Sequence, residues 1–296
     1  MISHLRLKAY GKINLALDVL GKRPDGYHEV RMIMQTVGLH DRIDLYCKDE
    51  PGIRIETNLF YVPDNEQNLA YRAAALLMDE FQIKKGLYIR LRKLIPVSAG
   101  MAGGSSDAAA VLFGVNKMFR LGLSLEELMK RGVTLGADIP YCLMRGTALS
   151  EGIGEKLTRL SPMPQCQVLI AKPGISVSTK TVYEDLDDME LTKEQHPDID
   201  GMLRAIEEGN LRQVAGRFGN VLELVTGKSY PVISQIEQVM MERGAVNAMM
   251  SGSGPTVFGL FDNPTAARAA YEALRFGPQA HLAKQVYLTN FYNCPH

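Results

Sequence analysis

One glycine- and serine-rich stretch dominates the sequence, and it reads Pro96-Val97-Ser98-Ala99-Gly100-Met101-Ala102-Gly103-Gly104-Ser105-Ser106-Asp107-Ala108-Ala109-Ala110. Apolar and polar residues alternate over residues 87–92, which is typical of a strand, and Pro96 ends that pattern. Ser105 or Ser106 is a suitable N-cap for a helix over residues 108–119. The pattern predicts a strand, a glycine loop and a helix in succession.

This succession of elements favours anion binding. Glycines let the backbone take positive φ angles and approach a ligand closely. The first N–H groups of a helix, together with the helix dipole, attract negative charge. An ordinary Gly/Ser turn is the alternative, but three glycines, two serines and a clear helix start favour a phosphate loop.

The loop differs from two familiar phosphate-binding motifs. A P-loop ends in Gly-Lys-Ser or Gly-Lys-Thr, whereas this helix begins with serines. Elsewhere, Gly227-Lys228-Ser229 has Leu222 where a P-loop needs glycine. Leu157 stands where a dinucleotide fingerprint starting at Gly152 would need its last glycine. Neither motif is therefore present.

Length and composition set broad limits. The 296 residues exceed the usual single-core domain and predict two subdomains, and turn-forming residues cluster around residues 150–165. Basic and acidic side chains number 33 each, so nothing attracts the chain generally to nucleic acid or an anionic membrane. Residues 1–10 lack the apolar core of a signal peptide, and no apolar run could span a membrane. The four cysteines are not spaced as the paired ligands of a metal site or as a redox pair, and they are Cys47, Cys142, Cys166 and Cys294. We therefore expect a cytoplasmic protein.

The N-terminal stretch predicts a strand with a polar face. Residues 5–20 alternate in polarity, and Lys12, Asn14 and Asp18 fall on the polar side. A solvated face is the ordinary alternative for Lys12.

An aromatic residue and an imidazole follow the next loop. Tyr27 and His28 suit a nucleobase, because one ring can stack on the base while the other reads its edge. Half-buried packing is the alternative for Tyr27.

An aspartate marks the end of a further predicted helix. Ser124 to Glu127 form a capping box, which predicts a helix that runs to about Gly136. Pro140 disfavours helix at the residue before it, so Asp138 is expected on a bend at the helix end. A carboxylate near a helix C-terminus is electrostatically unfavourable, which indicates another cause, functional or turn chemistry.

The sequence of the C-terminal half predicts mainly helices. A second glycine loop covers residues 251–255 and contains more glycines than a simple turn needs. The acidic stretches 184–190 and 193–200 predict a solvated connection. Helical patterns cover residues 201–208, 211–225, 231–243 and 264–276, and strand patterns cover residues 168–171, 256–261 and 285–291.

Three stretches together resemble the motifs of the GHMP kinases, the family that includes galactokinase and the homoserine and mevalonate kinases. Residues 96–110 resemble the second motif, and Ser251-Gly252-Ser253-Gly254-Pro255 resembles the third. Lys12-Ile13-Asn14-Leu15, followed by Asp25-Gly26-Tyr27-His28, resembles the first motif of the branch that acts on 4-diphosphocytidyl-2-C-methyl-D-erythritol. The motifs occur in family order, and the resemblance covers nearly the whole chain. Met101, Ala102 and the extra Gly104 depart from the common Gly-Leu-Gly-Ser-Ser pattern and suit this branch better than galactokinase.

The resemblance implies a fold. It is α+β with two domains, each a mainly antiparallel sheet packed with helices, and an active site in the cleft between them. We expect an ATP-binding domain over residues 1–160 and a C-terminal domain over residues 161–296.

The resemblance also implies a reaction. ATP, with Mg²⁺, would phosphorylate the 2-hydroxyl of the methylerythritol unit in the non-mevalonate route to isoprenoid precursors. A kinase for another small alcohol, of the homoserine or mevalonate type, is the alternative.

The family pattern assigns roles to individual residues. Lys12 and Asp138 would be catalytic, and Ser105 or Ser106 would contact Mg²⁺. Asn68 would lie near the adenine, although a helix cap explains it equally well. The implied ATP-binding residues are Asn68 and the loop Pro96, Val97, Ser98, Ala99, Gly100, Met101, Ala102, Gly103, Gly104, Ser105 and Ser106. The implied substrate-binding residues are Asn14, Tyr27, His28, Thr179 and Tyr183, of which Tyr27 and Tyr183 would stack on the cytosine.

The sequence disfavours two other classes of function. A silent binding protein with this fold is disfavoured because Lys12 and Asp138 are both present. A nucleic-acid binder is disfavoured by the zero net charge. We expect a small-molecule substrate, no nucleic acid or membrane partner, and a monomer or homodimer.

Overall fold

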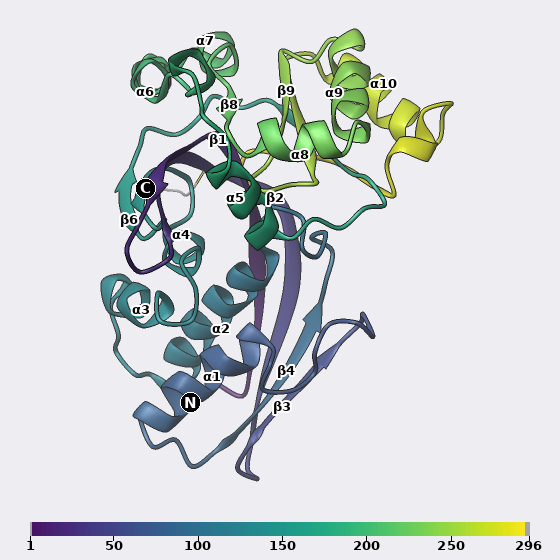
Figure 1. Cartoon of the computed structure of the whole chain (residues 1–296). Coiled ribbons are helices and arrows are strands. Elements are labelled where there is room, and N and C mark those ends of the chain that lie inside the picture. Colours follow the sequence, from purple (N-terminus) through teal and green to yellow (C-terminus); the bar gives the residue numbers. More distant parts are fainter. Residues whose placement is uncertain (1, 294–296) are drawn as a thin grey trace. The chain divides into compact units, whose positions relative to one another are not determined.

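The computed structural model describes residues 2–293, so Cys294 lies outside the described residues (Figure 1). The chain folds as two compact units, each assembled from several segments. Unit 1 comprises Met1–Gly11, Leu39–Val97 and Ala102–Met144, and unit 2 comprises Lys12–Gly38, Ser98–Met101 and Arg145–His296. Because the units interleave in sequence, the expected boundary at residue 160 stays a prediction.

Unit 1 is a sheet covered by helices. Its strands follow the order β3-β4-β2-β1, with β3 parallel and β2 antiparallel to β4. Helices α1 and α2 lie side by side, and α2 approaches the sheet so closely that a Cβ atom on Gly114 would lie 2.4 Å from Leu45 Cδ1. The elements are β1 (His4–Lys22) and β2 (His28–Lys48), which both continue into unit 2, and β3 (Ile53–Thr57), α1 (Leu69–Glu80), β4 (Gly86–Arg92), α2 (Gly103–Phe119), α3 (Leu125–Gly132) and α4 (Ile139–Met144).

Unit 2 contains part of the same sheet and a second sheet. Strand β5 pairs antiparallel with β2 and with β6, and β8 pairs parallel with β1. The second sheet has the order β11-β7-β10-β9 and is antiparallel throughout, and residues of α9 and α10 share its apolar core. The elements are β5 (Thr147–Gly152), β6 (Lys156–Arg159), β7 (Gln167–Lys172), α5 (Thr179–Asp187), η1 (Lys193–Gln195), α6 (Ile199–Glu207), α7 (Leu211–Ala215), β8 (Gly219–Asn220), α8 (Glu223–Ser229), α9 (Val232–Glu242), β9 (Asn247–Met250), β10 (Val257–Phe261), α10 (Pro264–Arg275), η2 (Ala280–Leu282) and β11 (Gln285–Asn290).

The expected α+β fold with mainly antiparallel sheets is confirmed, and residues 2–293 include two parallel strand pairs, β3 with β4 and β1 with β8. Among residues 2–293, no helix has both the length and the apolar character needed to cross a membrane.

The acidic connection in the C-terminal half is largely exposed, as predicted, although it contains helical segments: α5 continues to Asp187, η1 covers Lys193–Gln195 and α6 begins at Ile199. One sequence prediction in this half is wrong. The single helix over residues 211–225 is two helices separated by β8. Tertiary contacts explain the break, because Gly219 pairs with Ala16 of β1 and the ring of Phe218 packs 5.3 Å from that of Phe258.

Candidate active site

The three motifs meet at one serine hydroxyl within unit 2. Ser251 Oγ donates a hydrogen bond to the carbonyl oxygen of Gly100 at 2.9 Å and accepts one from the backbone N–H of Asn14 at 3.2 Å. Ser251 is fully buried, so both bonds are shielded from water. A single side chain therefore joins the strand of the first motif, the phosphate loop and the third motif.

This junction depends on glycine at two positions. Gly100 has a φ of +74°, and a Cβ atom there would lie 2.0 Å from the carbonyl oxygen of Ser251. Gly252 has a φ of +59°, and its Cβ position lies 3.4 Å from Asn14 Oδ1. A Cβ atom at Gly100 would overlap this backbone oxygen, so only glycine fits there, and the positive φ of Gly252 favours glycine.

Two side chains outside the three sequence motifs, the buried Asn220 and the half-buried Glu223, hold the third motif. Asn220 Nδ2 donates to the carbonyl oxygens of Met250 and Gly252, at 3.0 and 2.8 Å. Glu223 Oε2 accepts the backbone N–H of Met250 at 2.9 Å. Asn220 lies in the unexpected strand β8, Glu223 begins α8 just after it, and no local sequence pattern pointed to either residue.

Lys12 lies in this junction and not on a solvated face. Its side chain is buried, its Nζ donates to Asn14 Oδ1 at 2.6 Å, and its backbone N–H donates to the carbonyl oxygen of Met101 at 3.2 Å. Asn14 Nδ2 is 3.3 Å from Met32 Sδ. Among the described residues of its own unit, Lys12 forms no ion pair, which leaves its ammonium charge available to a ligand.

The phosphate loop alternates in backbone conformation. Ser98, Gly100 and Ala102 have φ angles of +50°, +74° and +53°, while the residues between them have ordinary negative φ. Such alternation turns successive N–H groups toward a shared concavity that suits an anion.

Helix α2 begins directly after this loop. It starts at Gly103 after Ala102, which makes no side-chain capping hydrogen bond, so the expected N-cap at Ser105 or Ser106 is wrong. Ser106 Oγ instead donates to the carbonyl oxygen of Tyr10 at 2.6 Å. The first-turn N–H groups of α2 are thus left for a ligand.

A buried charged network lies beneath the start of α2, within unit 1. Lys93 Nζ donates to Asp107 Oδ2 at 2.6 Å and also binds Asp41, whose Oδ1 accepts the backbone N–H of Ile95 at 2.8 Å. Burial raises the pKa of Asp107 well above its usual value, against the opposing effect of the Lys93 ammonium. Gly103 packs on this network, because its Cβ position lies 3.2 Å from Lys93 Nζ.

Asp138 occupies a different place from the one expected. Helix α3 ends at Gly132, and Asp138 directly precedes α4, whose Cys142 N–H bonds to the carbonyl oxygen of Asp138 at 3.0 Å. Pro140 is tolerated because it lies in the first turn of α4, where its missing N–H costs little. A carboxylate at a helix N-terminus is favourable, so the electrostatic argument for a functional Asp138 was wrong and only the family pattern supports it.

The expected base-binding residues come partly together in unit 2. The rings of His28 and Tyr183 lie 4.6 Å apart with 31° between their planes, and His28 Nε2 is 2.7 Å from Asp187 Oδ1. Tyr27 is 59% exposed, so the packing alternative does not hold for it. Thr179 Oγ1 is 2.7 Å from Ser253 Oγ, which ties α5 to the third motif.

Asn68 serves as the helix cap. Its Oδ1 accepts the backbone N–H of Ala70 at 2.9 Å, and its Nδ2 donates to the carbonyl oxygen of Pro63 at 2.7 Å. Proximity to adenine stays a prediction.

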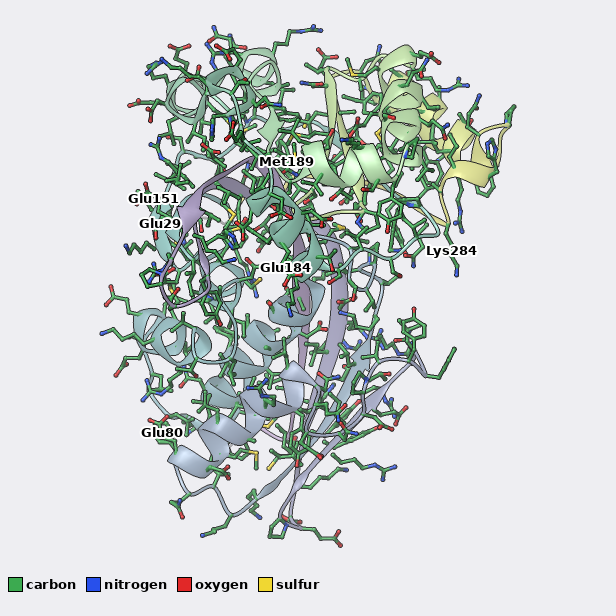
Figure 2. All side chains as sticks on the ribbon, in the orientation of Figure 1. Glu29, Glu80, Glu151, Glu184, Met189 and Lys284 are labelled. Atoms are coloured by element: carbon green, nitrogen blue, oxygen red, sulfur yellow. The ribbon has the colours of Figure 1, made fainter. Side chains whose placement is uncertain are left out.

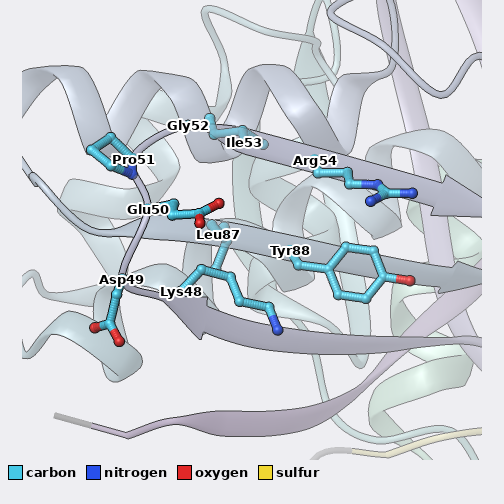
Figure 3. Close-up of a pocket in the computed structure, with 9 residues that line it drawn as sticks. All are labelled: Lys48, Asp49, Glu50, Pro51, Gly52, Ile53, Arg54, Leu87 and Tyr88. Carbon is cyan, nitrogen blue, oxygen red and sulfur yellow. The ribbon is translucent and has the colours of Figure 1, made fainter.

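A separate hollow of about 730 Å³ occurs at the strand ends of unit 1 (Figure 3). Lys48, Arg54 and Tyr88 line it together with the turn between β2 and β3. No residue of the three motifs lines this hollow, so it is distinct from the candidate site.

Comparisons with known proteins agree with this geometry. The family model for the GHMP kinases N terminal domain matches residues 68–146, and the model for the GHMP kinases C terminal matches residues 193–279. The chain is 58% identical over 288 residues to a 4-diphosphocytidyl-2-C-methyl-D-erythritol kinase from Lachnoclostridium phytofermentans, covering 97% of both. It is 56% identical to the protein of that name from Lachnospira eligens, covering 97% of this chain and 98% of the relative.

Solved structures give the same assignment. A crystal structure of 4-(cytidine 5'-diphospho)-2C-methyl-D-erythritol kinase superposes with a TM-score of 0.82 at 30% identity, covering 98% of this chain and all of the other. The homoserine kinase of Cytophaga hutchinsonii has a TM-score of 0.78 at 18% identity, with coverage of 98% and 95%, and shares the fold. The chain belongs to the GHMP kinases and, within them, to the 4-diphosphocytidyl-2-C-methyl-D-erythritol kinases.

Proposed function

We propose that this chain transfers the γ-phosphoryl group of ATP to the 2-hydroxyl of 4-diphosphocytidyl-2-C-methyl-D-erythritol, in the non-mevalonate route to isoprenoid precursors. The observation that carries the proposal is the meeting of the three motifs at Ser251 Oγ. The activity that the relatives' names state supports this substrate over homoserine or mevalonate.

ATP binds through the loop from Pro96 to Ser106. The alternating φ angles of the loop and the uncapped start of α2 supply N–H donors for the β- and γ-phosphates. Asn68 lies near the adenine in this proposal.

Mg²⁺ accompanies ATP. Ser105 fits it better than Ser106, because Ser105 is partly exposed whereas Ser106 is buried, and a hydroxyl oxygen suits this cation. No cluster of three or more histidine, cysteine or acidic side chains suited to a metal occurs within residues 2–293. When bound, Mg²⁺ neutralises charge on the phosphates.

Two residues act on the acceptor. The Asp138 carboxylate accepts the proton of the 2-hydroxyl as the new P–O bond forms and the bond between the γ-phosphorus and ADP breaks. The buried Lys12 ammonium favours the developing alkoxide. Asn14 positions Lys12 and contacts the substrate.

The cytidine diphosphate part of the substrate is held in unit 2. Tyr27 and Tyr183 stack on the cytosine, His28 reads its edge, and Thr179 lies near the diphosphate. We also propose that the protein is cytoplasmic and works as a monomer or homodimer. Its domain boundary lies at about residue 160 in this proposal.

Asp138→Asn tests the chemical step. We expect kcat to fall by about 10²- to 10⁴-fold, the usual size of a general-base contribution, with both substrates still bound, in a coupled assay of ADP release. Lys12→Met should lose a comparable factor, and the double variant much less than the product, because the two groups act as one unit. Glu126→Gln, an exposed acid in the first turn of α3, is the matched control.

Near-normal kcat for Asp138→Asn would refute the assigned role. Activity on homoserine or mevalonate but not on the cytidyl substrate would refute the proposed acceptor.

A further inference from the structure

One carboxylate outside the three motifs contacts both strands that flank the loop of residues 23–27. Asp187 Oδ1 is 2.7 Å from His28 Nε2, and Asp187 Oδ2 accepts a hydrogen bond from Lys22 Nζ at 2.6 Å. Lys22 ends β1, His28 begins β2 and Asp187 ends α5, all within unit 2. Asp187 thus fixes α5 to both ends of the loop that carries Tyr27.

The imidazole of His28 is held on two sides. Its edge meets Asp187, and its ring packs 4.6 Å from the ring of Tyr183. The His28 side chain is only 10% exposed, whereas that of Lys22 is 57% exposed. Another acid of α5 differs: Glu184, which is labelled in Figure 2, is exposed, and its one ion pair among residues 2–293 is with Lys180 at 3.7 Å.

The partner of Nε2 decides which ring nitrogen carries the proton. Hydrogen bonds from Lys22 and His28 lower the pKa of Asp187, so its carboxylate is ionised and can only accept. Nε2 must then bear hydrogen, and in the neutral ring Nδ1 presents a lone pair. His28 is thereby prepared to accept a hydrogen bond through Nδ1.

We propose that Asp187 is a positioning residue that makes this site selective for cytosine over uracil by fixing the tautomer of His28. Cytosine carries an amino donor at position 4, whereas uracil carries a keto acceptor there. A lone pair on Nδ1 bonds to the amino group and repels the keto oxygen. The inference rests on the proposed function, because it assumes that His28 reads the base.

The test compares the cytidine substrate with its uridine analogue. In Asp187→Asn the amide can donate to Nε2, which admits the tautomer with hydrogen on Nδ1. We expect the ratio of kcat/KM for cytidine over uridine to fall by about 10- to 100-fold, the discrimination one good polar pair provides. The change should lie in KM, with kcat for the cytidine substrate within about twofold. Asp185→Asn, an exposed neighbour on α5, should keep the original ratio.

A second measurement reads the tautomer without any substrate. Nitrogen-15 NMR of His28 should show hydrogen on Nε2 in the unchanged protein and a mixture of tautomers in Asp187→Asn and Asp187→Ala. Two variants of different size keep the test informative if one of them folds poorly.

Four outcomes would contradict the inference or the function on which it rests. An unchanged cytidine-to-uridine ratio in Asp187→Asn, or hydrogen on Nδ1 in the unchanged protein, overturns the inference. Equal loss on both substrates makes Asp187 merely structural and also overturns it. Failure of the unchanged protein to phosphorylate the cytidine substrate refutes the proposed function instead, and the NMR result still reports on His28.

Discussion

The two halves of the phosphate loop are anchored by different chemistry. Ser98–Met101 belongs to unit 2 and is held by neutral hydrogen bonds, one from Ser251 Oγ and one from the backbone N–H of Lys12. The half from residue 102 onward belongs to unit 1 and rests on the buried charges of Lys93, Asp41 and Asp107. One short loop therefore combines two modes of stabilisation.

The two anchors predict different tolerance of the two loop halves to substitution. A neutral hydrogen bond contributes about 0.5–1.5 kcal/mol, so losing one weakens the fold modestly. A buried charge that loses its partner has no water to replace it, which makes the ionic half far less tolerant. The ionic half carries the start of α2, where fixed N–H directions matter most for phosphate.

The largest expected effect is that of Lys93→Met. It removes the cation from two carboxylates that are almost fully buried, and we expect a loss of about 3–5 kcal/mol in the free energy of unfolding, measured with urea. Lys85→Met removes an exposed ion pair with Asp49 and should cost less than about 1 kcal/mol. Equal costs for the two variants would contradict the ionic anchor.

A smaller loss is expected for the neutral half. Ser251→Ala leaves the carbonyl of Gly100 and the N–H of Asn14 without this partner, and we expect a loss of about 1–3 kcal/mol in the free energy of unfolding. Ser234→Ala, whose exposed hydroxyl bonds to Pro231, is the control and should change little. A loss greater than that of Lys93→Met would reverse the comparison.

The smallest expected effect concerns the carboxyl group of Glu237, which interacts with Glu223. Burial and the charge of Glu223 raise the pKa of Glu237 to about 9, and Glu223 accepts the N–H of Met250 next to Ser251. The folded protein keeps a proton that the unfolded chain releases above its ordinary pKa of 4.5, so stability falls as pH rises from about 4.5 to 9.

Glu237→Gln removes this titration. We expect Tm at pH 8 to rise by about 2–4 °C, which corresponds to about 1 kcal/mol, and little change near pH 4.5. Thermal unfolding followed by circular dichroism at both pH values measures it, with the exposed Glu242→Gln as control. The same Tm rise at both pH values would mean that Glu237 is not the titrating group.

Local patterns in the sequence were sufficient for much of the fold. The strand expected over residues 87–92, the cap at Asn68 and the capping box at Ser124 appear as predicted, because alternation and capping act within a few residues. The motifs likewise identified the loop residues and the family. Errors arose where a neighbour distant in sequence prevailed, as where β8 interrupts the expected helix over residues 211–225.

The sequence by itself determined which residues could do the chemistry, since motif composition and glycine placement are written along the chain. Only the tertiary structure decided how they are supported. Ser251 lies 237 residues from Asn14, Lys93 lies 52 from Asp41, and Asp187 lies 159 from His28. The physical reason is that a buried polar group must find a partner wherever the fold places one, and periodicity along the chain carries no information about such distant pairs.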